Sequence, residues 1–351
     1  MPEKLIQVEN LSVTFKTQGG DIEAVRGVSF DIEHSENVAI VGESGSGKSV
    51  TALSLLKLHE ERQVDYPQGK IIYKRKDLML ATEAEMRQVR GKDISMIFQE
   101  PMSSLNPVYP VGVQIQETLK LHQNMDQSSS RRIAIDLLDR VGIREPQQKV
   151  DAFPHMLSGG QRQRAMIAMA LACDPVLLIA DEPTTALDVT VQQQILDLLK
   201  DLQQETNMSV LLITHDLNLV RRFADRVCVM HEGEIVEQAP SSTLFKQPQH
   251  EYTRYLLESE PDSRIAEIEP GIDTVIEAEN LRVYFPVRKG FFKRKVDEVR
   301  AVDDIDLQLR QGETLGIVGE SGSGKTTLGM ALLRMVDSTG LIRFRENTIS
   351  D

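Results

Sequence analysis

The stretch Gly42–Ser49 (GESGSGKS) constrains the fold more than any other part of the chain. It fits the pattern G-x-x-x-x-G-K-[ST], in which glycines let backbone N–H groups turn inward around a polyphosphate. Residues 37–41 before it form an apolar run, and residues 49–58 after it have helical apolar spacing. Strand, glycine-rich loop and helix in this order predict a nucleotide site, with Lys48 at the phosphates and the Ser49 hydroxyl at Mg²⁺.

The same stretch occurs twice in the chain. Residues 318–325 repeat residues 41–48 letter for letter, and Thr326 takes the place of Ser49. A repeat of this size indicates two copies of a domain. Because few residues follow the second loop, we expect a complete first domain at 1–258, a linker at 259–273 and a truncated second domain at 274–351. The truncated copy is expected to hold only a hairpin, the phosphate loop and the following helix, and to be poorly packed.

Composition excludes several classes of protein. The formal net charge of −13 argues against a nucleic-acid binder, which normally has a positive field. The two cysteines, Cys173 and Cys228, lie far apart, so neither a disulfide framework nor a zinc site is expected. The N-terminus lacks the apolar core of a signal peptide, and the longest apolar runs are strand-sized. We therefore expect any membrane role to act through a partner.

Buried apolar strands alternate with helices after the first loop. The runs at 37–41, 175–180 and 209–214 are followed by the polar phosphate loop, by Asp181 and Glu182, and by His215. This alternation predicts an α/β fold with a mostly parallel sheet, whose strand ends bring those polar residues to one edge. Further expected elements are an antiparallel hairpin at 5–33, strands at 69–78 and 93–99, a helical insertion at 100–157 with helices at 113–122 and 131–141, and helices at 162–173 and 191–204.

Two further features remain open on the residues alone. Phe15 lies on the first predicted strand, where its ring could stack on an adenine or pack in the core. The basic run 288–295 in the second hairpin could touch lipid head groups or form a solvated hairpin tip.

Five short motifs resemble those of ABC ATPases and occur in the order of that family. Leu157–Gln161 (LSGGQ) resembles the signature motif, and Leu177–Glu182 (LLIADE) resembles the Walker B strand. Thr185–Asp188 is similar to the D-loop, Gln99 to the Q-loop glutamine and His215 to the switch histidine. The resemblance implies a P-loop NTPase fold of ABC type, with a parallel core, an antiparallel subdomain and a helical subdomain.

The resemblance also implies roles for individual residues. Asp181 would bind Mg²⁺ through water, together with Ser49 and Gln99. Glu182 would be the general base, Gln99 would orient the attacking water, and His215 would contact the γ-phosphate and pair with Asp188 across a dimer. The expected nucleotide-binding residues are Phe15, Gly42, Ser44, Gly45, Gly47, Lys48 and Ser49 in the first copy, and Phe285, Gly319, Gly322, Gly324, Lys325 and Thr326 in the second.

No threonine at position 50 is assigned to the nucleotide site. The residue after Ser49 is Val50, whose side chain has no hydroxyl. The hydroxyl expected at Mg²⁺ in the first copy is therefore that of Ser49.

The signature residues Ser158, Gly159, Gly160 and Gln161 would bind an ATP held by the opposite nucleotide-binding domain. Residue by residue, structural alternatives exist: Asp181 and Glu182 as a surface acidic pair, Gln99 as an ordinary strand end and His215 as a cap. Their occurrence together in family order favours the functional interpretation.

Three stretches resemble the oligopeptide/dipeptide importer ATPases. They are residues 99–108 (QEPMSSLNPV), 153–155 (FPH) and 248–253 (PQHEYT), the last within a C-terminal extension from about 237. Glu251 replaces the proline that is usual there. The tandem arrangement looks most like the fused ATPase of microcin C-type peptide importers. No cysteine follows Cys228, so no iron–sulfur cluster is expected.

The resemblance implies partners and a location. Residues 100–157 would bind integral-membrane permease subunits, and a second nucleotide-binding domain would come from a homodimer or a partner ATPase. A periplasmic peptide-binding protein would be linked indirectly, and no nucleic acid is expected. The protein would be peripheral at the cytoplasmic face of the bacterial inner membrane. Two alternatives stay open: a truncated remnant that binds ATP without coupling it, and a soluble ABC ATPase outside transport.

Overall fold

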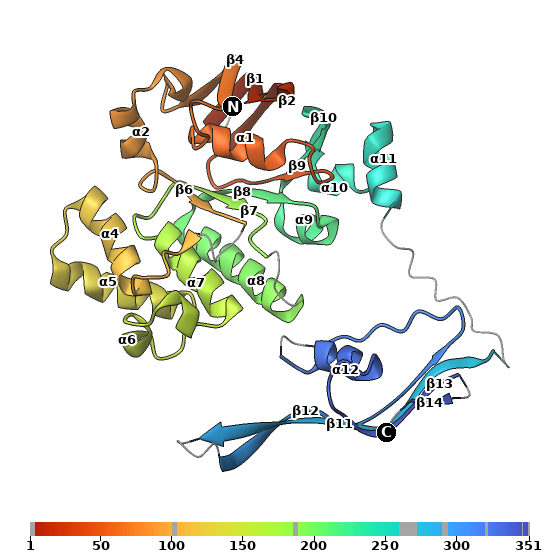
Figure 1. Ribbon diagram of the computed structural model, residues 1–351. Helices are drawn as coiled ribbons and strands as arrows, with labels where there is room; N and C mark the ends of the chain where they lie inside the picture. The colour runs from red at the N-terminus through yellow and green to blue at the C-terminus, as the bar shows by residue number, and fades with distance from the viewer. Residues whose placement is uncertain are drawn as a thin grey trace. The chain divides into compact units, whose positions relative to one another are not determined.

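The computed structural model describes residues 4–99, 104–184, 189–259, 272–289, 294–319, 322–345 and 347–349. The chain forms two compact units (Figure 1). Most residues up to 261 belong to the first unit, and residues 262–351 belong to the second. Each unit is described by itself.

An antiparallel sheet in the first unit has the strand order β2-β1-β4-β5. Its strands are β1 (Lys4–Thr17), β2 (Gly20–Glu33), β4 (Val64–Tyr73) and β5 (Lys76–Asp77). The hairpin predicted at 5–33 is confirmed as the β1–β2 pair. The single strand predicted at 69–78 is wrong, because Lys74 and Arg75 adopt left-handed φ values of 46° and 63° and form a turn. A short 3₁₀ helix, η1 (Leu78–Leu80), and helix α2 (Glu83–Val89) follow.

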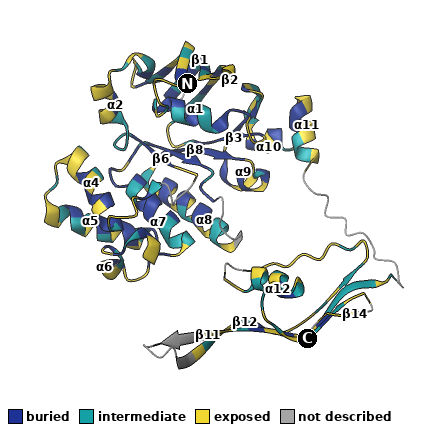
Figure 2. Ribbon diagram, viewed as in Figure 1, coloured by how far each residue is buried: buried dark blue, intermediate teal, exposed yellow. Residues whose placement is uncertain are grey.

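The central sheet of the first unit has the order β10-β9-β3-β8-β7-β6. Its strands are β3 (Asn37–Val41), β6 (Ile94–Ile97), β7 (Leu177–Asp181), β8 (Ser209–Thr214), β9 (Arg226–His231) and β10 (Glu234–Pro240). All pairings except β9–β10 are parallel. Every residue of β3, β7 and β8 is buried, as the apolar runs predict for a covered parallel sheet (Figure 2). The carboxyl ends of these strands therefore lie together at one edge.

Along the chain, the helices of the first unit lie between the strands of this sheet and after the last one. They are α1 (Lys48–Leu55), α4 (Val111–Gln123), α5 (Gln127–Arg140), α6 (Pro146–Lys149), α7 (Gly159–Ala170), α8 (Val189–Thr206), α9 (Leu217–Phe223), α10 (Ser241–Leu244) and α11 (Glu251–Glu258), with a 3₁₀ turn η2 (Pro154–Met156). The helical insertion is confirmed over its described residues. Helix α1 ends earlier than predicted, because Lys57 adopts a left-handed φ of 48°.

The core of the first unit lies on both faces of the central sheet. Ala39 and Val41 pack in the cluster that holds α4, α5 and α7 side chains. Val38 and Ile40 pack in the other cluster, with the antiparallel sheet. The alternation follows from the two-residue period of a strand. No helix in the described parts of the chain is long and apolar enough to cross a membrane.

The second unit contains an antiparallel sheet of order β12-β11-β13-β14 and one helix among its described residues. Its elements are β11 (Thr274–Lys289), β12 (Arg294–Arg310), α12 (Lys325–Leu332), β13 (Thr339–Phe344) and β14 (Asn347–Thr348). The prediction of hairpin, loop and helix alone is incomplete, since β13 pairs with β11. The buried core is small: Ala278, Leu281, Val283, Val302, Leu328, Ala331 and Ile342.

One repeated segment differs between the two units. Residues 314–318 correspond to β3, yet they are not in a strand, and Val318 is 91% exposed. In the first unit, β8 and β9 flank β3.

Candidate active site

The loop between β3 and α1 has a backbone that only glycine can supply at two positions. Gly42 has φ 153°, and a Cβ there would lie 2.1 Å from the Met230 carbonyl oxygen. Gly47, the N-cap of α1, has φ 102°, and a Cβ there would lie 2.5 Å from the Ala24 carbonyl oxygen. The loop therefore leads into the positive N-terminal end of α1, an arrangement that favours anions.

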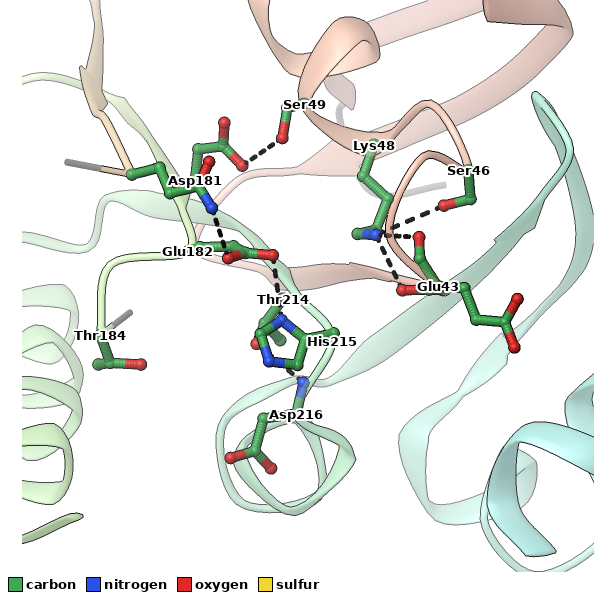
Figure 3. Close-up of polar contacts among 12 residues, drawn as sticks. Glu43, Ser46, Lys48, Ser49, Asp181, Glu182, Thr184, Thr214, His215 and Asp216 are labelled. Carbon is green, nitrogen blue, oxygen red and sulfur yellow. Dashed lines mark hydrogen bonds and ion pairs between the residues drawn. The ribbon is translucent and has the colours of Figure 1, made fainter. Parts of the chain in front are cut away.

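Lys48 closes the loop on itself. Its Nζ donates to the carbonyl oxygens of Gly42 at 2.8 Å and Glu43 at 2.7 Å, and it lies 3.4 Å from Ser46 Oγ (Figure 3). Burial lowers the pKa of Lys48, and the nearby carboxylates of Glu182 and Asp181 oppose that shift. The ammonium group is thus held at the loop by carbonyl oxygens and by negative charge.

Ser49 and Asp181 bring a hydroxyl and a carboxylate together. The Ser49 hydroxyl donates to Asp181 Oδ1 at 2.9 Å. Asp181 is the last residue of β7 and is buried. Burial raises its pKa, the Ser49 hydrogen bond lowers it, and the charge of Glu182 raises it further; the net direction is upward. A hydroxyl and a carboxylate are oxygen ligands that suit Mg²⁺, which binds proteins through one or two carboxylates plus substrate phosphates. Among the described residues, no group of three or more His, Cys, Asp or Glu side chains could hold a metal ion.

Position 50, the next residue of helix α1, is a valine and not a threonine. Val50 is partly buried and packs against the core cluster that includes Val38 and Ile40. Its backbone carbonyl accepts from the Ser54 hydroxyl at 2.7 Å. Position 50, to which no nucleotide role is assigned, thus carries no hydroxyl, and the Val50 side chain packs α1 against the core.

The Glu182 carboxylate contacts residues that follow β6 and β8. Gln99 Nε2 donates to Glu182 Oε2 at 2.9 Å, and His215 Nδ1 lies 3.1 Å from Glu182 Oε1. The Glu182 backbone N–H donates to the Ile213 carbonyl, and its φ is 44°, a left-handed value rare for a non-glycine residue. Figure 3 shows Glu182 between Asp181 and His215. Three residues predicted for catalysis therefore lie in contact, whereas Asp188 lies outside the described residues.

The signature residues form the N-terminus of helix α7, in the same unit as the phosphate loop. Ser158 is the N-cap of α7: its hydroxyl accepts from the Gln161 N–H at 3.3 Å, and Gln161 Oε1 accepts from the Ser158 N–H at 3.1 Å. This capping box places Gly159 and Gly160 in the first turn of the helix.

Phe15 is half-buried on β1 and packs partly against the core. Its ring meets the His59 imidazole edge-to-face, with centroids 5.2 Å apart. The sequence did not single out His59. Phe15 therefore contributes to the core, and its stacking on an adenine stays a prediction.

The second loop repeats the backbone of the first. Gly319, Gly322 and Gly324 have φ values of 153°, 83° and 94°, against 153°, 83° and 102° for Gly42, Gly45 and Gly47. Lys325 Nζ donates to the Gly319 carbonyl at 2.6 Å. Thr326 is exposed, and Phe285 on β11 is 44% exposed.

Tyr252 is a residue at the loop that the sequence signalled only as part of the stretch 248–253. Its hydroxyl oxygen accepts from the Glu43 backbone N–H at 3.2 Å. The sequence of this stretch shows an aromatic residue at position 252, but it does not indicate that this residue contacts the phosphate loop.

A protein-family model described as "ABC transporter" matches residues 25–185 and 302–351. The chain belongs to the ABC transporter family. The match includes the first phosphate loop, the signature motif and the Walker B strand of this ABC protein, and also the second loop.

Curated relatives of this ABC protein are transport ATP-binding proteins. One is the "Peptidoglycan transport ATP-binding protein YejF" of Agrobacterium fabrum, 54% identical over 97% of this chain and 63% of the relative. Another is the "Glutathione import ATP-binding protein GsiA" of Pectobacterium atrosepticum, 47% identical over 96% of this chain and 59% of the relative. The chain thus spans less than two thirds of the length of these relatives.

Solved ABC cassettes share the fold. The dimeric post-hydrolysis state of the ATP-binding cassette MJ0796, bound to ADP and Pi, has a TM-score of 0.61 and 29% identity. The likeness covers 67% of this chain and 98% of the cassette. The predicted fold class, an ABC-type P-loop NTPase fold with an antiparallel and a helical subdomain, is confirmed.

The raised pKa of Asp181 predicts that this residue lowers the stability of the nucleotide-free protein. A carboxyl whose pKa is higher in the folded state disfavours folding at a pH where it is ionised. Asp181→Asn should therefore raise the Tm at pH 7, and its advantage should shrink as acid protonates Asp181 in the wild type. Calorimetry at pH 7 and pH 5 without nucleotide checks this; a lower Tm for the variant at pH 7 would contradict it.

Proposed function

We propose that this chain is the ATP-binding and ATP-hydrolysing subunit of a bacterial ABC importer for peptides. The observation that carries the proposal is the meeting of Lys48, the Ser49–Asp181 pair and Glu182 at the carboxyl ends of β3 and β7. A phosphoryl transfer site needs a cation for the phosphates, a metal ligand and a group that activates water, and these residues supply each.

The contacts suggest how the site would work. Lys48 would exchange its bonds to loop carbonyls for bonds to the β- and γ-phosphate oxygens. Mg²⁺, which Ser49 and Asp181 would hold, supplies charge neutralisation when it is bound. Glu182 would accept a proton from the attacking water, and the hydrogen bonds from Gln99 and His215 would fix its carboxylate.

A second nucleotide-binding domain would complete each site. The first turn of α7, at Ser158–Gln161, presents backbone N–H groups that suit a phosphate. We propose that it contacts ATP held by the other domain, which would come from a second copy of this chain or from a partner ATPase. The dimeric cassette of similar fold supports this arrangement.

The importer role rests on the relatives, whose names specify peptidoglycan transport and glutathione import. We propose peptides or microcin C-like peptides as substrates, delivered by a periplasmic binding protein to permease subunits. The helical region 100–157 would bind those permeases at the cytoplasmic face of the inner membrane. Its exposed apolar side chains Val108, Tyr109, Val113 and Leu121 support a protein partner there.

The solution mass of the Glu182→Gln variant tests this proposal. The variant should bind Mg-ATP without hydrolysing it, so a closed dimer should accumulate. We expect light scattering to report a monomer without nucleotide and a dimer with Mg-ATP. The double variant Glu182→Gln, Ser158→Arg is the matched control and should stay monomeric. A monomer throughout, despite measured ATP binding, would contradict the two-domain site.

A further inference from the structure

We propose that Tyr252 is a positioning residue for the phosphate loop, through which helix α11 of the C-terminal extension sets nucleotide affinity. The inference rests on the proposed ATP site. The Tyr252 hydroxyl accepts from the Glu43 backbone N–H at 3.2 Å, across a sequence separation of 209 residues. Tyr252 is only 8% exposed, so water competes little for this bond.

The Tyr252 ring lies next to the first turn of the phosphate loop. It stacks on His231, with ring centroids 3.8 Å apart and planes inclined by 24°. His231 ends β9, and the carbonyl of the preceding Met230 is the group that a Cβ on Gly42 would strike. The ring therefore stacks on His231, and the neighbouring residue Met230 packs against Gly42. Gly42 directly precedes Glu43, whose N–H the Tyr252 hydroxyl binds.

The extension that carries Tyr252 is itself tied to the central sheet. Both carboxylate oxygens of Glu237, on β10, accept backbone N–H bonds at 2.9 Å, one from Gln249 and one from His250. His250 is the N-cap of α11, and its Nδ1 accepts from the Tyr252 N–H at 3.2 Å. These bonds fix the first turn of α11 on β10. The position of the Tyr252 hydroxyl is thus set by the bonds that hold α11 to β10; Figure 1 shows where these two elements lie in the first unit.

The side chains of Tyr252 and Lys48 bind the two backbone polar groups of Glu43. The Glu43 N–H donates to Tyr252, while the Glu43 carbonyl accepts from Lys48 Nζ at 2.7 Å. When phosphate draws Lys48 away from that carbonyl, the bond from Tyr252 would remain on the loop's first turn. Without it, the free loop would sample other conformations, and nucleotide binding would have to order it.

The test compares Tyr252→Phe with Tyr255→Phe. Both remove one hydroxyl from α11, but the Tyr255 side chain is 57% exposed. For Tyr252→Phe, we expect the Kd for Mg-ATP by calorimetry to rise about three- to tenfold, the cost of one neutral hydrogen bond. The Tm should change little, because the ring and its stack on His231 are kept. Tyr255→Phe should leave Kd within about twofold.

Hydrogen exchange of the nucleotide-free protein gives an independent readout. In Tyr252→Phe, amides of residues 42–47 should exchange faster while those of β3 and β8 stay unchanged; a role in overall stability would not give this local pattern. If the wild type binds Mg-ATP and both variants match it in Kd and loop exchange, the positioning role is overturned and the ATP site stands. If the wild type does not bind Mg-ATP, the proposed function fails, and the affinity claim for Tyr252 falls with it.

Discussion

Lys48→Ala should reduce ATP turnover by about 100-fold or more, whereas Lys325→Ala should leave it within about twofold of the wild type. The two lysines lie in loops of identical sequence with nearly identical glycine φ values. Their surroundings differ. Lys48 is buried beside Asp181 and Glu182, whereas Lys325 is only partly buried and the hydroxyl residue after it, Thr326, is exposed.

Phosphate release by the two variants, measured side by side at saturating Mg²⁺, checks this expectation. Because the substitution is the same in both loops, any general effect of losing a lysine is controlled. Equal losses in the two variants would show that the second loop also supports hydrolysis. Unchanged turnover in Lys48→Ala would place the active site elsewhere.

Glu182→Gln should lower kcat by about 10²–10⁴-fold while the Kd for Mg-ATP stays within about threefold of the wild type. Glutamine has nearly the same shape and can still accept from Gln99, but it cannot take a proton from water. Single-turnover phosphate release and equilibrium binding separate the two quantities. Glu61→Gln, the same change at an exposed site, is the control and should alter neither.

A parallel loss of affinity and turnover in Glu182→Gln would mean that Glu182 holds nucleotide rather than activating water. Turnover within about tenfold of the wild type would mean that another group is the base. The left-handed φ of Glu182 adds a reason for a specific role, since strained backbone is retained where function requires it.

Elements with strong local patterns could be predicted from the sequence. The buried strand β8, the helices α4 and α5 and the β1–β2 hairpin follow from apolar spacing and turn residues. The break between β4 and β5 could not, because Lys74 and Arg75 are not typical turn residues, and their φ values follow from the pairing of the end of β4 with the two-residue strand β5.

Residues that meet at the site come from distant parts of the chain. Gln99, Glu182 and His215 are predicted by family order, but their hydrogen bonds follow from the strand order of the parallel sheet. The bond from Glu43 to Tyr252 has no local signal at all, because it depends on how α11 is tied to β10.

The two copies of one stretch separate local from tertiary information. Within the stretch 41–48 and its repeat, sequence by itself determined the loop: the glycines adopt matching φ values in both units, because backbone preferences act within a few residues. Only tertiary structure decided what precedes the loop. Residues 37–41 form a buried strand between β8 and β9, whereas residues 314–318 are not in a strand in the described part of the second unit. A strand exists only where neighbours accept its backbone hydrogen bonds and cover its side chains.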